Sequence, residues 1–134
     1  MIEPNPTQTL RQQTVAASVH HQAVAASVSE VAGLLQELLS RRLTAYIAGV
    51  KDGKTVTRWA NGEVTEIRDH GTEQRLRAAY EIAQLLLSHD SPQTVKVWFI
   101  GLDPALGDTA PAEAIRAGRL QEAFSAARAF LAHG

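Results

Sequence analysis

Apolar residues recur at intervals of three and four positions along most of this chain, and this spacing gathers them on one face of an α-helix. The clearest run is Val31, Leu34, Leu35, Leu38 and Leu39. Glycine and proline interrupt the pattern often enough to divide it into short segments. We therefore expect an all-α fold of roughly seven helices.

Capping residues and helix breakers predict where these helices begin and end. Ser29 and Thr72 are the expected N-caps of two helices, and Ser91 is expected to cap a third that opens with Pro92. Residues 1–12 carry two prolines in polar surroundings and are expected to be disordered. The predicted helices begin at residue 29 and then cover residues 43–50, 54–60, 72–88, 92–100, 111–117 and 120–131.

The chain divides into three predicted parts. Residues 1–28 are an Ala-rich, flexible or helical N-terminal arm, in which the run from Thr14 to Val19 is echoed nine residues later, from Ala23 to Val28. Two readings of this arm stay open, a plain amphipathic helix and an arm that dimerises. Residues 29–71 form the second part and residues 72–134 the third, and the helix Thr72–Ser88 is shared between them.

Composition excludes several classes of protein. The chain has 134 residues, a formal net charge of −1 and no cysteine, so disulfides and thiolate chemistry are absent and bulk attraction to nucleic acid is not expected. Its start lacks the basic and apolar regions of a signal peptide, and its apolar runs are too short to span a membrane. We expect a cytoplasmic protein.

The segment from Leu43 to Gly62 has the pattern of a helix-turn-helix. Ala45 is the small residue that lets the second helix cross the first closely, and Gly49 is the turn residue at the elbow. Val50 follows as an apolar plug, and Val56 and Trp59 are the inward positions of the second helix. The turn at residues 51–53 is one residue longer than the usual spacing, and Asp52 is expected to face phosphate.

Positive charge concentrates in this segment. Residues 41–58 carry five cations and one carboxylate, although the whole chain has a net charge of −1. A local basic stretch on a helix-turn-helix indicates DNA contact; the alternative is a packing scaffold whose charges are merely solvated. The candidate DNA-binding residues are Arg41, Arg42, Lys51, Lys54, Thr55, Thr57 and Arg58.

A second series of motifs lies in the C-terminal part. It comprises Trp98-Phe99, Asp103-Pro104-Ala105-Leu106-Gly107, Thr109-x-Pro111, Glu113 and Ile115-Arg116-x-Gly118. Together with the upstream helix-turn-helix, this series resembles the Xre/MbcA/ParS family of type II antitoxins. The resemblance extends from about Ser29 to Leu131, and it implies an Xre-like helix-turn-helix followed by a small helical toxin-binding domain.

The resemblance also implies partners. Members of this family neutralise a RES-type toxin that destroys NAD, often repress their own operon, and cover the entrance of the NAD pocket with their C-terminal region. For this chain it implies a homodimer that binds operator DNA and a RES-type toxin, which it contacts through residues 103–118 and the tail 129–134. The candidate toxin-binding residues are Asp103, Pro104, Leu106, Gly107, Pro111, Arg116, Arg119, His133 and Gly134. Trp98 and Phe99 are expected to be core anchors.

Enzyme chemistry has no sequence support. The five histidines lack metal-ligand spacing, and no glycine-rich loop follows a predicted strand. We therefore expect no metal, no cofactor and no catalytic residue. Two alternatives to an antitoxin stay open: a stand-alone transcriptional regulator whose C-terminal part only dimerises or senses a ligand, and an adaptor that has lost DNA binding.

Overall fold

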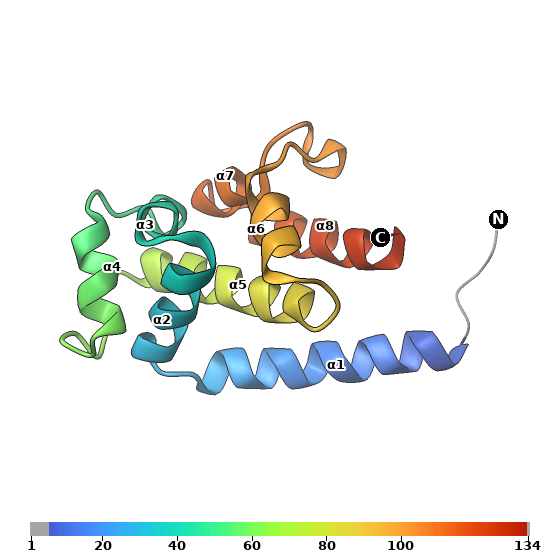
Figure 1. Cartoon of the computed structure of the whole chain (residues 1–134), viewed down its shortest axis with the longest axis horizontal. Coiled ribbons are helices and arrows are strands. Elements are labelled where there is room, and N and C mark those ends of the chain that lie inside the picture. The colour runs from blue at the N-terminus through green and yellow to red at the C-terminus, as the bar shows by residue number, and fades with distance from the viewer. Residues whose placement is uncertain (1–5, 134) are drawn as a thin grey trace.

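The computed structural model describes residues 6–133, which form eight α-helices and one 3₁₀ turn without a named strand (Figure 1). This confirms the all-α prediction. In chain order the elements are α1 (Pro6–Ala25), α2 (Val28–Leu39), α3 (Arg41–Ala48), α4 (Gly53–Ala60), α5 (His70–Leu87), α6 (Pro92–Ile100), the 3₁₀ turn η1 (Pro104–Leu106), α7 (Pro111–Arg116) and α8 (Leu120–His133).

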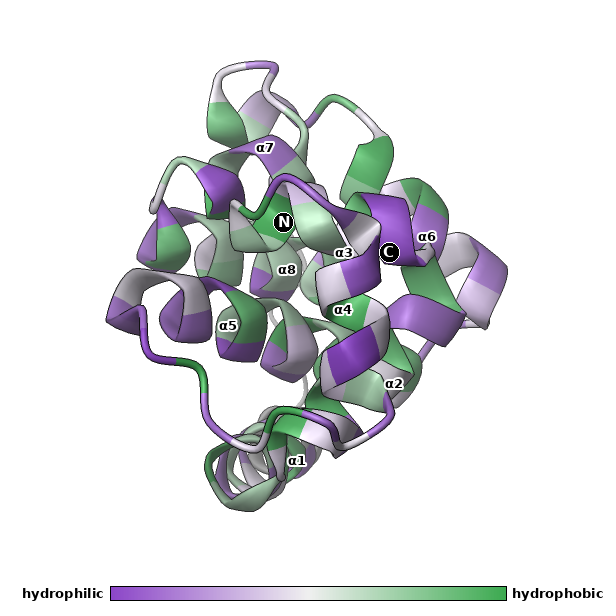
Figure 2. Ribbon diagram, turned by 90° about the vertical axis from the view of Figure 1, so that its left-hand side faces the viewer, coloured by the Kyte–Doolittle hydropathy of each residue, from purple (hydrophilic) through white to green (hydrophobic). Residues whose placement is uncertain are grey.

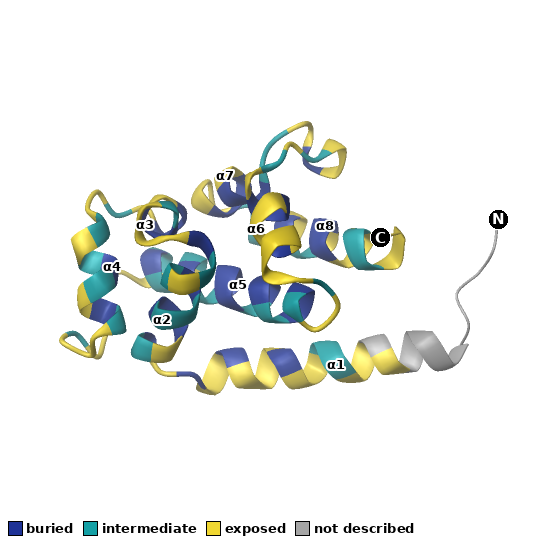
Figure 3. Cartoon of the chain, viewed as in Figure 1, coloured by how far each residue is buried: buried dark blue, intermediate teal, exposed yellow. Residues whose placement is uncertain are grey.

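Helix α5 is the centre of the structure. It packs against α1, α2, α3, α6, α7 and α8, so it contacts helices from all three predicted parts of the chain. Leu76, Ala79, Ile82, Ala83 and Leu86 are almost fully buried along it. Figure 3 shows that the buried residues described in α1, by contrast, lie on the side of the helix that faces α5. One continuous apolar core therefore joins the N-terminal and C-terminal helices.

Helix α2 begins two residues earlier than its predicted cap implies. Its N-cap is Ser27, whose hydroxyl accepts a hydrogen bond from the Glu30 N–H at 3.1 Å, and the expected cap Ser29 lies inside the helix. The Ser29 hydroxyl instead donates to the Ala60 carbonyl at 2.8 Å. Both serines are suitable N-caps by residue type. Ser29 is instead engaged by the carbonyl at the end of α4, and this leaves Ser27 as the cap.

The prediction for the start of α5 was also wrong. The N-cap is Asp69, and its carboxylate accepts from the Thr72 N–H at 2.8 Å. Thr72 itself is buried in the first turn. The hydrogen bond from the Thr72 N–H, followed by the interaction with the Thr72 hydroxyl, holds the pKa of Asp69 below its usual range.

This cap leads to a prediction about acid stability. Because the folded pKa of Asp69 is depressed, its charge stabilises the fold above about pH 4 and this contribution disappears as pH falls through the folded pKa. We expect the unfolding free energy of the wild type to exceed that of Asp69→Asn at neutral pH, and the gap to close below about pH 4. Urea unfolding of both proteins between pH 7 and pH 3 measures this gap; a constant gap would contradict it.

Helix α1 corrects the prediction for residues 6–12, which are helical. Pro6 is the first residue of the helix, a position where proline is well tolerated because no N–H is needed there. The C-terminal end of α1 is held by Arg77, whose Nη1 donates to the Ala23 carbonyl at 3.0 Å and to the Ala26 carbonyl at 2.8 Å. Residues 1–5, also expected to be disordered, lie outside the described residues.

Other predicted boundaries are confirmed or nearly so. Ser91 caps α6, which begins with Pro92 and ends at Ile100. Gly118 adopts the left-handed conformation after α7, with φ 84°. The last helix extends two residues further than predicted, to His133. Among residues 6–133, no helix combines the length and the apolar character that crossing a membrane would need.

Candidate nucleic-acid interface and docking loop

Helices α2, α3 and α4 pack against one another as a three-helix unit. Helix α3 ends at Ala48 and is capped by Gly49, whose φ of 83° reverses the chain and whose N–H donates to the Ala45 carbonyl at 3.0 Å. Four residues, Gly49–Asp52, separate α3 from α4, which lies within the usual length of a helix-turn-helix turn. Ala45, Val56 and Trp59 are buried between the helices, as the spacing predicts.

Helix α4 begins at Gly53, one residue before the predicted start, because Asp52 caps it. The Asp52 carboxylate accepts from the Lys54 N–H at 2.9 Å, so it has a structural task at this surface. Gly53 is a helical residue and not the expected turn glycine. It lies against the aliphatic stem of Arg41, whose Cγ is 3.2 Å from the place a Cβ would occupy.

The five predicted cations are all exposed. None of Arg41, Arg42, Lys51, Lys54 and Arg58 lies within 4.0 Å of a carboxylate in the described part of the chain. Figure 2 shows hydrophilic stretches on α4 at the end of the molecule that faces the viewer. These side chains are free to contact an anion outside the molecule.

Three of these cations stand where they destabilise the helices. Arg41 and Arg42 are the first two residues of α3, and Lys54 is the second residue of α4. A cation in the first turn opposes the helix dipole and costs roughly 0.3–1 kcal/mol. The same position is favourable for an external phosphate, because the free N–H groups and the cation both attract it. Interaction with the helix dipole therefore does not explain the charges of these residues.

The two threonines of α4 lie closer to the core than predicted. Thr55 and Thr57 are half-buried, and the Thr57 hydroxyl donates to Gln36 Oε1 of α2 at 2.9 Å. Thr57 therefore fixes α4 on α2, and its expected role on the outer face is not supported. The exposed face of α4 consists of Lys54, Arg58 and, at the end of the helix, Asn61.

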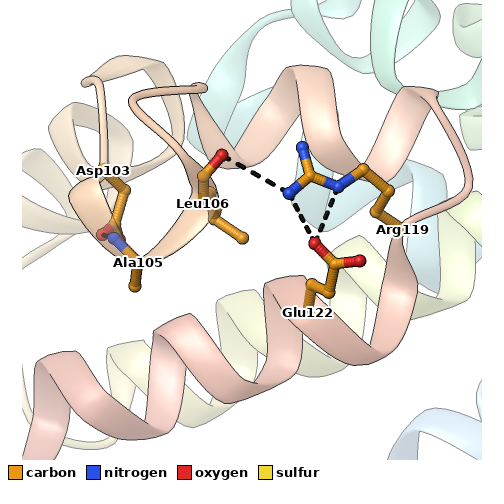
Figure 4. A network of polar contacts seen from close by, with 5 residues as sticks. All are labelled: Asp103, Ala105, Leu106, Arg119 and Glu122. Atoms are coloured by element: carbon orange, nitrogen blue, oxygen red, sulfur yellow. Dashed lines mark hydrogen bonds and ion pairs between the residues drawn. The ribbon is translucent and has the colours of Figure 1, made fainter.

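The predicted docking loop between α6 and α7 is tightly built (Figure 4). Asp103 caps η1 through the Ala105 N–H at 2.9 Å, and its own N–H donates to the Thr109 carbonyl at 3.2 Å. Gly107 takes φ 66° and allows the chain to turn back. Arg119 reaches from the start of α8 to the Leu106 carbonyl at 3.4 Å and pairs with Glu122 at 2.8 Å.

Several candidate docking residues serve the fold. Leu106 and Pro111 are buried, so their side chains are not available to a partner in this conformation. Trp98 and Phe99 are buried core residues, as predicted. Leu102 is 72% exposed next to the loop, and sequence reasoning missed it because nothing local distinguishes an exposed from a buried leucine.

Arg116 of α7, next to the docking loop, contacts Tyr46 of α3 in the helix-turn-helix. Its Nη1 donates to the Tyr46 carbonyl at 2.6 Å, and its guanidinium lies 4.5 Å from the centre of the Tyr46 ring. Arg75 contacts the same end of α3, where its Nε donates to the Ala48 carbonyl at 3.0 Å. Arginines of α5 and α7 thus bind carbonyls in the last turn of α3 and hold the elbow in place.

The loop and the last helix share a surface. Ala105 of η1 lines a groove of about 390 Å³ with five residues of α8, namely Gln121, Glu122, Ser125, Ala126 and Ala129. The groove thus joins Ala105 of the predicted segment 103–118 to Ala129, the first residue of the predicted tail 129–134, and its other lining residues lie outside both segments. His133 is exposed at the end of α8, whereas Gly134 lies outside the described residues.

No group of three His, Asp or Glu side chains is arranged to hold a metal ion within residues 6–133. Comparisons of the chain with protein-family models, curated proteins and solved structures find no match. The assignment of function therefore depends on the residues and their geometry.

Proposed function

We propose that this chain is the antitoxin of a type II toxin–antitoxin pair. One end of it contacts operator DNA through an Xre-like helix-turn-helix formed by α3 and α4. The other end, formed by the η1 loop, α7 and α8, docks onto a RES-type toxin and covers its NAD pocket. The chain works as a homodimer in the cytoplasm and represses its own operon.

The observation that carries DNA contact is the position of the free cations. Arg41, Arg42 and Lys54 occupy helix N-termini, where they oppose the helix dipole, and none of them has an ion-pair partner in the described chain. Phosphate contact would convert this cost into binding energy. Lys51 and Arg58 extend the same charge along the turn and α4.

Support for toxin docking comes from the resemblance and from the architecture of the loop. Its backbone is held by the Asp103 cap and by the hydrogen bond from the Asp103 N–H to the Thr109 carbonyl, and Leu102 and Pro104 are exposed on it. A loop held in this way loses less conformational entropy on binding than a free segment. The groove between Ala105 and α8 adds a concave surface next to it.

One observation favours the second candidate, a stand-alone transcriptional regulator. Arg116 and Arg119, two of the expected toxin contacts, are engaged within the chain by Tyr46 and Glu122. In that case α7 and the loop would only support the helix-turn-helix. The two candidates differ in whether an NAD-degrading partner exists.

Intracellular NAD distinguishes them. We expect NAD to fall in cells that express the adjacent toxin gene and to stay at its normal level when this chain is co-expressed. Leu102→Asp should lose protection, because a charge on an exposed docking residue is not compensated in the complex. Val24→Asp is the matched control, since Val24 is 66% exposed on α1. If NAD never falls, the regulator is the better assignment.

A further inference from the structure

Helix α6 carries the largest exposed aliphatic side chains of the C-terminal half. Val97 is 64% exposed and Ile100 is 53% exposed, and Leu102 follows directly in the loop. Only Val95, Trp98 and Phe99 of this helix are buried. Val97 and Ile100 lie three residues apart and are neighbours on the helix surface, so they form an apolar patch and are not isolated surface residues.

The patch continues into a groove. Gln93 and Lys96 line a groove of about 430 Å³ between α6 and α2, and with Val97 and Ile100 they form one helical stripe at spacings of three and four. The floor of the groove is apolar, because Leu34 and Leu38 of α2 and Leu87 at the end of α5 line it. We call this surface, made of the stripe and the groove, the α6 face.

Charge on the α6 face is self-complementary. Glu37 of α2 and Lys96 of α6 line the same groove from its two sides, both are exposed, and neither is ion-paired within the described chain. In an interface with two-fold symmetry the same surface meets itself. Lys96 of one copy can then pair with Glu37 of the other, twice.

We propose that the α6 face is the surface through which two copies of this chain associate. The arrangement of the helices agrees with this partner. Helix α4 lies at one end of the long axis, and α6 lies on a side of the molecule (Figure 1). A two-fold axis through the α6 face and parallel to the long axis brings both α4 helices to the same end, as a dimer that reads two half-sites requires.

This inference rests on the homodimer in the proposed function and on no other part of it. Sedimentation velocity of the full chain without DNA or toxin therefore tests it alone. We expect a concentration-dependent dimer, and we expect Val97→Asp with Ile100→Asp to raise its dissociation constant about 100-fold. Val24→Asp, equally exposed on α1, should leave the constant unchanged.

The charge pair supplies the sharper test. Glu37→Lys and Lys96→Glu should each weaken the dimer about tenfold, because each puts like charges opposite one another. The double variant restores opposite charges across the interface and should return to near wild-type affinity. Thermal unfolding of each variant checks that the fold is intact.

Three results would overturn the proposal: a wild type that is monomeric at every concentration, an unaffected dimer in the aspartate variant, or a double charge swap no better than the single changes. A monomer whose α6 variant fails to bind the toxin would assign this face to the toxin instead. In each case the phosphate contacts proposed for α3 and α4 would remain testable on DNA.

Discussion

Operator affinity is expected to fall about a thousandfold at about 0.1 M salt when Lys54 and Arg58 are both replaced by alanine. Both side chains are exposed on α4, and neither forms an ion pair in the described chain. Their removal therefore leaves no buried partner unsatisfied. The fold should survive, so that the loss belongs to DNA contact.

The magnitude follows from counterion release. Each phosphate contact contributes about 0.9 to the slope of log affinity against log salt, which at about 0.1 M salt is worth nearly one order of magnitude. A homodimer without Lys54 and Arg58 loses up to four contacts. Titration of operator DNA at several salt concentrations should therefore show a slope reduced by about three to four as well as the lower affinity.

A matched control separates local contact from net charge. Arg11→Ala with Arg128→Ala removes the same two charges from α1 and α8, where both side chains are also exposed. This control should keep most of the affinity and the slope. Equal losses in both double variants would mean that bulk charge, and not the α4 face, attracts DNA. NAD protection by the Lys54/Arg58 variant should be unchanged if the two ends act separately.

How much of this fold follows from the sequence depends on how local each signal is. Pro92 and Gly118 mark boundaries correctly, because a proline at the first helical position or a left-handed residue is a requirement of the chain itself. The predicted helix 43–50 is displaced by two residues at each end, because α3 covers Arg41–Ala48 and stops before Gly49. The neighbouring sequence does not determine whether Ser27 or Ser29 is the N-cap of α2. Both could cap α2, and the carbonyl of Ala60, 31 residues away, engages Ser29.

The same limit applies to α1 and α5. Residues 6–12 resemble a disordered start, yet they belong to a helix whose other end is fixed by Arg77, more than fifty residues away. For α5, Asp69 and Thr72 are both good caps by type. Because Thr72 is buried in the core, Asp69 is the residue that caps α5.

For the candidate sites, the sequence shows where charges are but not which of them are free. Arg58 and Arg116 are equally arginines near helix ends. Arg116 donates a hydrogen bond to the carbonyl of Tyr46, 70 positions away, whereas Arg58 has no ion-pair partner in the described residues. Leu102 and Leu106 likewise differ only in burial. Tertiary packing decides which cations lack an ion-pair partner and which leucines are exposed. For this reason the exposed residues of the docking loop are not the same as the residues of the motif that predicted it.

The elbow of the helix-turn-helix is expected to be the glycine most sensitive to substitution. Gly49→Ala should lower the unfolding free energy by about 3 kcal/mol, whereas Gly62→Ala should lower it by about 1 kcal/mol. The two glycines have nearly the same positive φ, 83° and 79°. Alanine also reduces the entropy of the unfolded chain equally at both positions. Backbone strain and unfolded-state effects therefore cancel in the comparison.

The two positions differ in the atoms that an alanine Cβ would contact. A Cβ at position 49 would lie 2.8 Å from Nη2 of Arg75, whereas nothing lies within 4 Å of a Cβ at position 62. The Arg75 guanidinium must then move, and we expect this shift to break the hydrogen bond from its Nε to the Ala48 carbonyl. A hydrogen bond from a charged donor contributes roughly 1.5–3 kcal/mol, which accounts for the expected difference between the two glycines.

Urea unfolding of the two alanine variants, alone and combined with Arg75→Ala, separates these contributions. In the Arg75→Ala background the guanidinium is gone, so Gly49→Ala should cost no more than Gly62→Ala. If Gly49→Ala stayed about 2 kcal/mol worse there, the elbow itself would be strained and Arg75 would not be its cause. The expected result instead makes Arg75 the contact through which α5 holds the C-terminal end of α3 at the elbow.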